Sequence, residues 1–128
     1  MRRLVPFIAL LATTLMAAPP AAAQAPAAVK IIVGYPAGAT SDALARVVAE
    51  HMATTLKQPV IVENKPGAGG RIANELVKAA AADGQTLLMT PIATMGIFPH
   101  SYEGQLRYDP FKDFVSVAHL SDFQVGLG

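Results

Sequence analysis

The 128-residue sequence contains no cysteine and no tryptophan, and charged residues make up only 15% of it. The absence of cysteine excludes a disulfide framework and any zinc or iron–sulfur site with cysteine ligands. The low charge does not indicate disorder, because 52% of the residues are hydrophobic. The formal net charge of +1 argues against a nucleic-acid-binding protein, which normally shows a basic patch. The length is that of one domain.

Catalytic and metal-binding patterns are also missing. His100 and His119 have no carboxylate at the spacing of a metal-ligand motif, and Ser101 and Ser121 do not stand in the Gly-x-Ser-x-Gly setting of a hydrolase. No pair of carboxylates is assigned to one cleft by the sequence. We therefore predict no catalytic residue, no metal site and no cofactor, and a function other than catalysis.

The glycine-rich segment 64–71 (NKPGAGGR) matches no nucleotide-binding motif. A Walker loop requires Gly-Lys followed by Ser or Thr, whereas Gly70 is followed by Arg71 and Ile72. Ile72 also occupies the place of the third small residue of the dinucleotide fingerprint. Three glycines are interpreted as a structural turn before a helix: Gly67, Gly69 and Gly70. The less favoured alternative is an exported enzyme that binds phosphate or a nucleotide at residues 67–70.

Residues 1–23 have the layout of a secretory signal peptide. Two arginines follow Met1, an apolar run spans residues 4–18, and three alanines end at Ala23. This run of fifteen residues is shorter than the roughly 20 that cross the hydrocarbon core of a membrane, which disfavours an uncleaved anchor. We predict cleavage after Ala23, a periplasmic location for the mature chain, and a flexible leader at residues 24–28.

Short β-branched runs alternate with helical patterns from residue 29 onward. The apolar spacing and the turn residues predict strand, helix, strand, helix and strand in turn, at residues 29–33, 42–56, 59–63, 71–82 and 86–90. This order is typical of an α/β fold with a parallel sheet and right-handed crossovers. We expect Thr40 or Ser41 to cap the first helix and Arg46 to pair with Glu50 on its exposed face. The core-facing side of that helix is expected to carry Leu44, Val47, Val48, His51 and Met52.

In an open parallel sheet, ligands bind beyond the carboxyl ends of the strands. The loop after the first strand contains Gly38, which permits close approach of a ligand, and the amides of residues 39–42 open the first helix. Such amides suit a carboxylate or a phosphate, and Tyr35 is placed to cover a small solute. The alternative is that this loop only turns the chain and caps the helix. In the loop after the third strand, the hydroxyls of Thr90 and Thr94 are expected to donate hydrogen bonds to an anion.

Beyond residue 90 the sequence predicts a loop with prolines, a short turn at residues 109–113 and an apolar stretch at residues 115–120. The last apolar stretch, residues 123–127, has the pattern of a strand that no turn follows. We therefore expect the chain to be a truncated N-terminal portion of a larger protein.

Four segments occur in the order and spacing of a known family, namely residues 31–42 (IIVGYPAGATSD), 60–70 (VIVENKPGAGG), 82–88 (ADGQTLL) and 106–114 (LRYDPFKDF). Together they resemble the extracytoplasmic solute-binding receptors of tripartite tricarboxylate transporters, the Bug family. The resemblance implies a two-lobed periplasmic binding protein of type II, whose cleft captures a small carboxylated metabolite and delivers it to the membrane permease components. For this chain it implies a partial first lobe at residues 29–114. Residues 115–128 would then start the crossover toward a missing second lobe.

The resemblance also assigns a carboxylate site to the first and third loops. The residues that it transfers are Tyr35, Gly38, Ala39, Thr40, Ser41, Asp42, Thr90, Ala93 and Thr94. Ala39 stands at the second glycine of the Pro-Gly-Gly common in the family, so the turn is expected to differ there. Met95 and Phe98 replace a common histidine and asparagine, so the ligand class does not transfer. The alternative to a receptor is a non-functional fragment with no ligand of its own.

Overall fold

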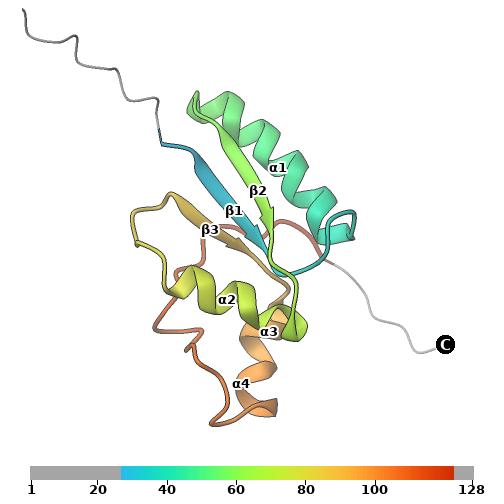
Figure 1. The fold of residues 1–128 in the computed structure, drawn as a ribbon, viewed down its shortest axis with the longest axis vertical. Helices are drawn as coiled ribbons and strands as arrows, with labels where there is room; N and C mark the ends of the chain where they lie inside the picture. Colours follow the sequence, from blue (N-terminus) through green and yellow to red (C-terminus); the bar gives the residue numbers. More distant parts are fainter. Residues whose placement is uncertain (1–26, 123–128) are drawn as a thin grey trace, which may run out of the picture.

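The computed structural model describes residues 27–122 and shows helices on both sides of one sheet (Figure 1). In chain order the elements are β1 (Val29–Val33), α1 (Thr40–Leu56), β2 (Val60–Asn64), the 3-10 turn η1 (Ala68–Gly70), α2 (Arg71–Lys78), β3 (Thr86–Met89), α3 (Ile92–Gly96) and α4 (Phe98–Ser101). The three strands are parallel, in the order β2-β1-β3. The predicted parallel βαβαβ arrangement is confirmed. The predicted signal peptide and the apolar stretch at residues 123–127 lie outside the described residues.

The central strand β1 is buried on both faces of the sheet. Ile31, Ile32 and Val33 are exposed by at most 2%. Such a continuous apolar run is what a parallel strand covered on both sides requires. Ile31 and Val33 pack with Ala45 and Ala49 of α1, whereas Ile32 points to the opposite face, against which α2 lies (Figure 1).

The carboxyl end of β1 is packed tightly against the start of α2. A Cβ atom on Gly34 would lie 2.8 Å from the Cα atom of Gly70 and 3.3 Å from the Cβ atom of Ala73. Real Cβ atoms do not approach another backbone that closely, so only glycine fits at position 34 without a shift of the chain. This contact brings the loop after β1 and the loop after β2 together.

The helix α1 begins at Thr40, two residues earlier than predicted, and its cap is not the predicted one. Ala39 is the N-cap residue and makes no side-chain hydrogen bond. Thr40 and Ser41 both lie inside the first turn, past the position from which a hydroxyl bonds the amides of the second and third helical residues. The prediction of a Thr40 or Ser41 cap is therefore wrong. The carboxylate of Asp42 instead reaches back and accepts a hydrogen bond from the N–H of Gly38 at 2.9 Å.

The buried face of α1 coincides only in part with the predicted one. His51 is exposed, and its Nδ1 atom lies 3.0 Å from the carbonyl oxygen of Val47, which is itself an exposed residue. The core prediction for His51 and Val47 is wrong, whereas Val48 and Met52 are partly buried against the core. The fully buried positions of α1 are instead Asp42, Ala45 and Ala49, none of which the prediction placed on the core-facing side.

The helix α2 ends at Lys78, earlier than the predicted residue 82. The side chain of Lys78 contacts the segment that follows α4. The Nζ atom of Lys78 donates to the carbonyl oxygen of Arg107 at 2.8 Å and lies 2.9 Å from a carboxylate oxygen of Asp113. The turn predicted at residues 109–113 is confirmed, since the N–H of Asp113 donates to the carbonyl oxygen of Asp109 at 2.9 Å. No helix within residues 27–122 has the length and hydrophobicity needed to cross a membrane.

Candidate functional site

Three loops meet at the carboxyl edge of the sheet, around Gly70 (Figure 1). The loop after β1 contributes Tyr35, whose hydroxyl donates to the carbonyl oxygen of Gly69 at 3.4 Å. A Cβ atom on Gly70 would lie 3.6 Å from both the Tyr35 hydroxyl and the methyl group of Thr94. The structure thus brings together residues from all three loops that the sequence analysis singled out.

The first loop leads into the N-terminus of α1. Gly38 has φ of 83°, and no atom lies within 4 Å of the position that a Cβ would take, so the loop is open at this point. Ala39 is extended, with φ of −70° and ψ of 162°, so an alanine at this position introduces no strain. The amides of Thr40 and Ser41 are among the first N–H groups of α1, which have no acceptor within the helix and carry the positive end of its macrodipole.

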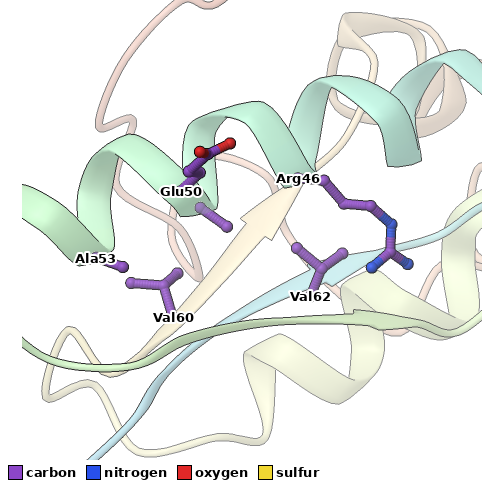
Figure 2. Close-up of a pocket in the computed structure, with 6 residues that line it drawn as sticks. Arg46, Glu50, Ala53, Val60 and Val62 are labelled. Carbon is purple, nitrogen blue, oxygen red and sulfur yellow. The ribbon is translucent and has the colours of Figure 1, made fainter.

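The carboxylate of Asp42 is buried and bonded on several sides. Asp42 is 3% exposed, and its donors are the N–H of Gly38 at 2.9 Å, Nε and Nη2 of Arg46 at 3.0 and 2.9 Å, and Nδ2 of Asn64 at 3.0 Å. These hydrogen bonds, that of Arg46 first, lower the pKa of Asp42 to about 2. Arg46 therefore pairs with Asp42 and not with Glu50 as predicted, and Figure 2 shows its guanidinium directed away from Glu50. The ionised carboxylate fixes the loop, and its charge is neutralised by Arg46.

Asn64, the last residue of β2, belongs to the site although the sequence analysis did not select it. Its Nδ2 atom donates to the carbonyl oxygen of Tyr35 at 3.1 Å and to the carboxylate of Asp42 at 3.0 Å. The side chain therefore ties the end of β2 to both ends of the first loop. The sequence did contain a signal for this residue, because Asn64 follows directly on a predicted parallel strand, and ligands bind beyond the carboxyl ends of such strands.

The third loop uses its hydroxyl groups internally. Thr94 is fully buried, and its Oγ1 atom donates to the carbonyl oxygen of Pro91 at 3.0 Å and lies 2.7 Å from Oγ1 of Thr90. The hydroxyl of Tyr108 donates to the carbonyl oxygen of Thr94 at 2.6 Å. Thr90 and Ala93 are half-buried, so of the two threonines only Thr90 retains access from outside the loop.

The second loop has the backbone of a tight turn and adds a positive charge beside the site. Gly67, Gly69 and Gly70 all have positive φ, at 142°, 67° and 95°. Arg71 follows them, and its Nε atom donates to the carbonyl oxygen of Ala68 at 3.0 Å. The guanidinium carbon lies 4.2 Å from the centre of the Tyr102 ring, a cation–π arrangement. This arginine, too, was not selected from the sequence.

A shallow hollow lies elsewhere, between α1 and the edge strand β2 (Figure 2). Its walls are mainly aliphatic, and it is lined by Arg46, Ala49, Glu50, Ala53, Val60 and Val62. It shares only Arg46 with the loop cluster, and that guanidinium is already committed to Asp42. The hollow is therefore not the candidate site. No group of three or more His, Asp or Glu side chains within residues 27–122 is arranged to hold a metal ion.

The match to known proteins agrees with this architecture. Residues 44–127 match the model of the tripartite tricarboxylate transporter family receptor. The chain belongs to this receptor family. It is 37% identical over 116 residues to a UPF0065 protein from the gbd 5' region of Cupriavidus necator and 36% identical over 118 residues to the protein BugT of Bordetella pertussis. These alignments cover 88% and 91% of this chain but 35% and 36% of the two relatives.

A solved structure also resembles the fold. MatC from Rhodopseudomonas palustris, solved with bound malate, is 40% identical, with a TM-score of 0.68 over 74% of this chain and 32% of MatC. The α/β architecture is therefore that of its periplasmic binding protein relatives. The chain spans about a third of the length of the relatives that it matches.

Proposed function

We propose that this chain provides part of the ligand site of a periplasmic solute-binding receptor, which captures a small carboxylated metabolite for a tripartite tricarboxylate transporter. The observation that carries the proposal is the open N-terminus of α1 beside Gly38, where the Asp42 carboxylate is already neutralised by Arg46. The dipole at this helix end therefore remains available to an anion. Membership of a receptor family and the malate bound to the relative MatC support a carboxylate.

The proposed contacts divide by type of group. The amides of Thr40 to Asp42 face the carboxylate, since that of Ala39 donates to the carbonyl oxygen of Pro36 at 3.2 Å. The hydroxyls of Thr40 and Ser41 assist, and Tyr35 covers the solute. The third loop closes the other side through Thr90 and Ala93, while Thr94 acts from behind because it is buried. We propose further that residues 29–114 belong to a first lobe, from which residues 115–128 lead toward a second lobe. The chain is exported, and a signal peptide is cleaved from it after Ala23. The permease components of the transporter receive the solute.

A receptor is favoured over the phosphate- or nucleotide-binding enzyme by the second loop itself. The glycines there are occupied by protein contacts, since a Cβ on Gly67 would overlap the Ile72 side chain and one on Gly69 would lie 3.3 Å from the Phe98 ring. Arg71 is engaged with Ala68 and Tyr102. Little of this loop is left to surround a phosphate.

The test compares two substitutions of Thr40 in the 128-residue chain by NMR titration with malate, succinate, citrate and inorganic phosphate. Thr40→Ala removes the hydroxyl alone, whereas Thr40→Pro also removes the first amide of α1. Proline is well tolerated at the first helical position, and the preceding Ala39 already has the extended conformation that proline requires. We expect Thr40→Pro to weaken carboxylate binding roughly fivefold more than Thr40→Ala, the worth of about one hydrogen bond.

Three outcomes would count against the proposal. Equal affinity of the two Thr40 variants would remove the α1 amide from the site. A preference for phosphate over every carboxylate would favour the enzyme alternative. No shift of any loop amide with any of the four anions would refute the receptor site altogether.

A further inference from the structure

A second hollow lies outside the three loops of the candidate site, beside α4 and the segment that follows it. It is shallow and open, with a volume of about 330 Å³. Three aromatic residues line it, namely Tyr102, Tyr108 and Phe111, together with the acidic residues Glu103 and Asp109. None of these five residues has a part in the proposed carboxylate site.

Hydrogen bonds within the chain fix the walls of this hollow. The N–H of Gln105 donates to the carbonyl oxygen of Tyr102 at 2.9 Å and closes a turn in which Gly104 has φ of 72°. Tyr108 is 5% exposed, and its hydroxyl donates to the carbonyl oxygen of Thr94 at 2.6 Å. The hollow is therefore formed before any partner binds, so binding requires little ordering of the chain.

The charge at the hollow is negative. The carboxylate of Asp109 accepts the N–H of Phe111 at 3.0 Å and lies 3.0 Å from Nζ of Lys112, whose hydrogen bond lowers the pKa of Asp109. The carboxylate of Glu103 forms no ion pair within residues 27–122. No cationic side chain lines the hollow. A positive group that enters it would therefore meet an uncompensated carboxylate.

The aromatic residues favour one kind of cation. The faces of aromatic rings attract guanidinium groups, and the chain contains an example beside the hollow, where the guanidinium carbon of Arg71 lies 4.2 Å from the centre of the Tyr102 ring. A guanidinium is planar, so it stacks on rings and pairs with a carboxylate through two parallel hydrogen bonds. An ammonium group does neither. Aromatic rings beside Glu103 thus suit arginine better than lysine.

The dimensions favour a side chain of a protein over a free solute. Small-molecule sites have volumes of roughly 300–1,000 Å³ and bury roughly 70–90% of the ligand surface. This open hollow lies at the lower end of that range. Phe111 is 87% exposed, and exposed aromatic side chains of this kind are enriched in protein interfaces. It offers apolar surface to the residues on either side of an inserted side chain.

We infer that this hollow is a docking site for an arginine side chain presented by a protein partner. The guanidinium pairs with the carboxylate of Glu103 and lies against the aromatic residues, and apolar neighbours of the arginine cover Phe111. The inference is independent of the proposed carboxylate site, because the two share no residue.

Three blocked pentapeptides test the inference by NMR titration of the 128-residue chain. They share valines on both sides of the central residue, which is arginine, lysine or citrulline, a neutral analogue of arginine with nearly the same shape. We expect the arginine peptide to bind about fivefold more tightly than the citrulline peptide, more tightly than the lysine peptide, and to shift the amides of residues 102–112. Equal affinity of the arginine peptide and either other peptide would overturn the inference, as would the absence of shifts in residues 102–112.

Two exposed positions separate the contribution of charge from that of apolar contact. Glu103→Gln removes the charge and keeps the shape, so the preference for arginine over citrulline should fall close to one. Glu50→Gln, an exposed carboxylate of α1, is the control and should leave the preference unchanged. Phe111→Ala should weaken both peptides alike, by about threefold, whereas Val115→Ala should not, although Val115 is 89% exposed. A preference that survives Glu103→Gln, or equal effects of the two alanine variants, would contradict the assigned contacts.

Two further measurements exclude other occupants of the hollow. N-acetylarginine methylamide carries the guanidinium without flanking valines and should bind more weakly than the arginine peptide, whereas equal affinity would make a free solute the ligand. Sedimentation velocity should show the same degree of self-association for Glu103→Gln and the unaltered chain. A loss of self-association in Glu103→Gln would make a second copy of the chain the partner, and either result would refute docking of an arginine from another protein.

Discussion

After β1 the chain turns through Gly38, and side chains of α1 and β2 hold the turn. The Asp42 carboxylate receives donors from the loop, from Arg46 and from Asn64. A buried carboxylate is tolerated only when it is paired and its lone pairs are bonded, and here both conditions are met. Each partner thus depends on the others, and the shape of the candidate anion site depends on all of them.

The pH dependence of stability should report on Asp42. Its pKa in the folded chain is about 2, below the ordinary value of 3.8. A carboxyl group whose pKa is depressed by folding stabilises the fold above its unfolded pKa and loses that contribution as the pH falls through its folded pKa. We expect the thermal midpoint to fall between about pH 4 and pH 2, and Asp42→Asn to lower the midpoint at pH 7 and flatten this fall. Circular dichroism melts at a series of pH values measure both.

Glu50→Gln is the matched control for this experiment, because it removes an exposed carboxylate from the same helix. The role given to Asp42 would be wrong if Asp42→Asn and Glu50→Gln had the same acid profile. It would also be wrong if the amide of Gly38 exchanged no faster in Asp42→Asn than in the unaltered chain.

Among the elements, β1 and α2 approach most closely where Gly34 meets Gly70. We expect Gly34→Ala to lower the free energy of unfolding by about 1–3 kcal/mol, because its Cβ would lie 2.8 Å from backbone that has no flexible end to move aside. Gly96→Ala is the control, since its Cβ would meet only a side-chain carbon of Ile92, at 4.0 Å, in a helix. That change should be neutral or stabilising by up to about 1 kcal/mol. Urea denaturation compares the two, and equal effects would contradict the close-packing argument.

The helix α1 illustrates how far periodicity predicts an element. The existence of this helix and most of its length follow from the 3.6-residue spacing of its apolar residues. The same spacing does not determine which of several adjacent faces of the helix is buried. Ala45 and Ala49 are buried because they pack with Ile31 and Val33 of β1, a contact that only the tertiary structure shows. His51 and Val47 therefore lie outside although their spacing suits the core.

On the scale of the whole molecule, the part described leaves much apolar surface uncovered. Phe111, Val115 and Val117 are 87%, 89% and 80% exposed, and β2 and β3 each have one edge unpaired within residues 27–122. Exposed apolar side chains and open strand edges both favour association. We expect the isolated 128-residue chain to self-associate as its concentration rises, and Val115→Lys with Val117→Lys to reduce this. Sedimentation velocity measures it, and a monomer at every concentration would contradict the expectation.

The sequence alone determined the α/β class, the order of the elements and the loops that meet at the carboxyl edge, because strand and helix periodicities and turn residues are local properties. Tertiary structure decided which groups in those loops are free. Asp42 and Thr94 were selected as ligand residues, yet one is committed to Arg46 and Asn64 and the other to Pro91 and Thr90. Hydrogen bonds between segments far apart in the chain assign each donor and acceptor, and no local pattern contains that assignment.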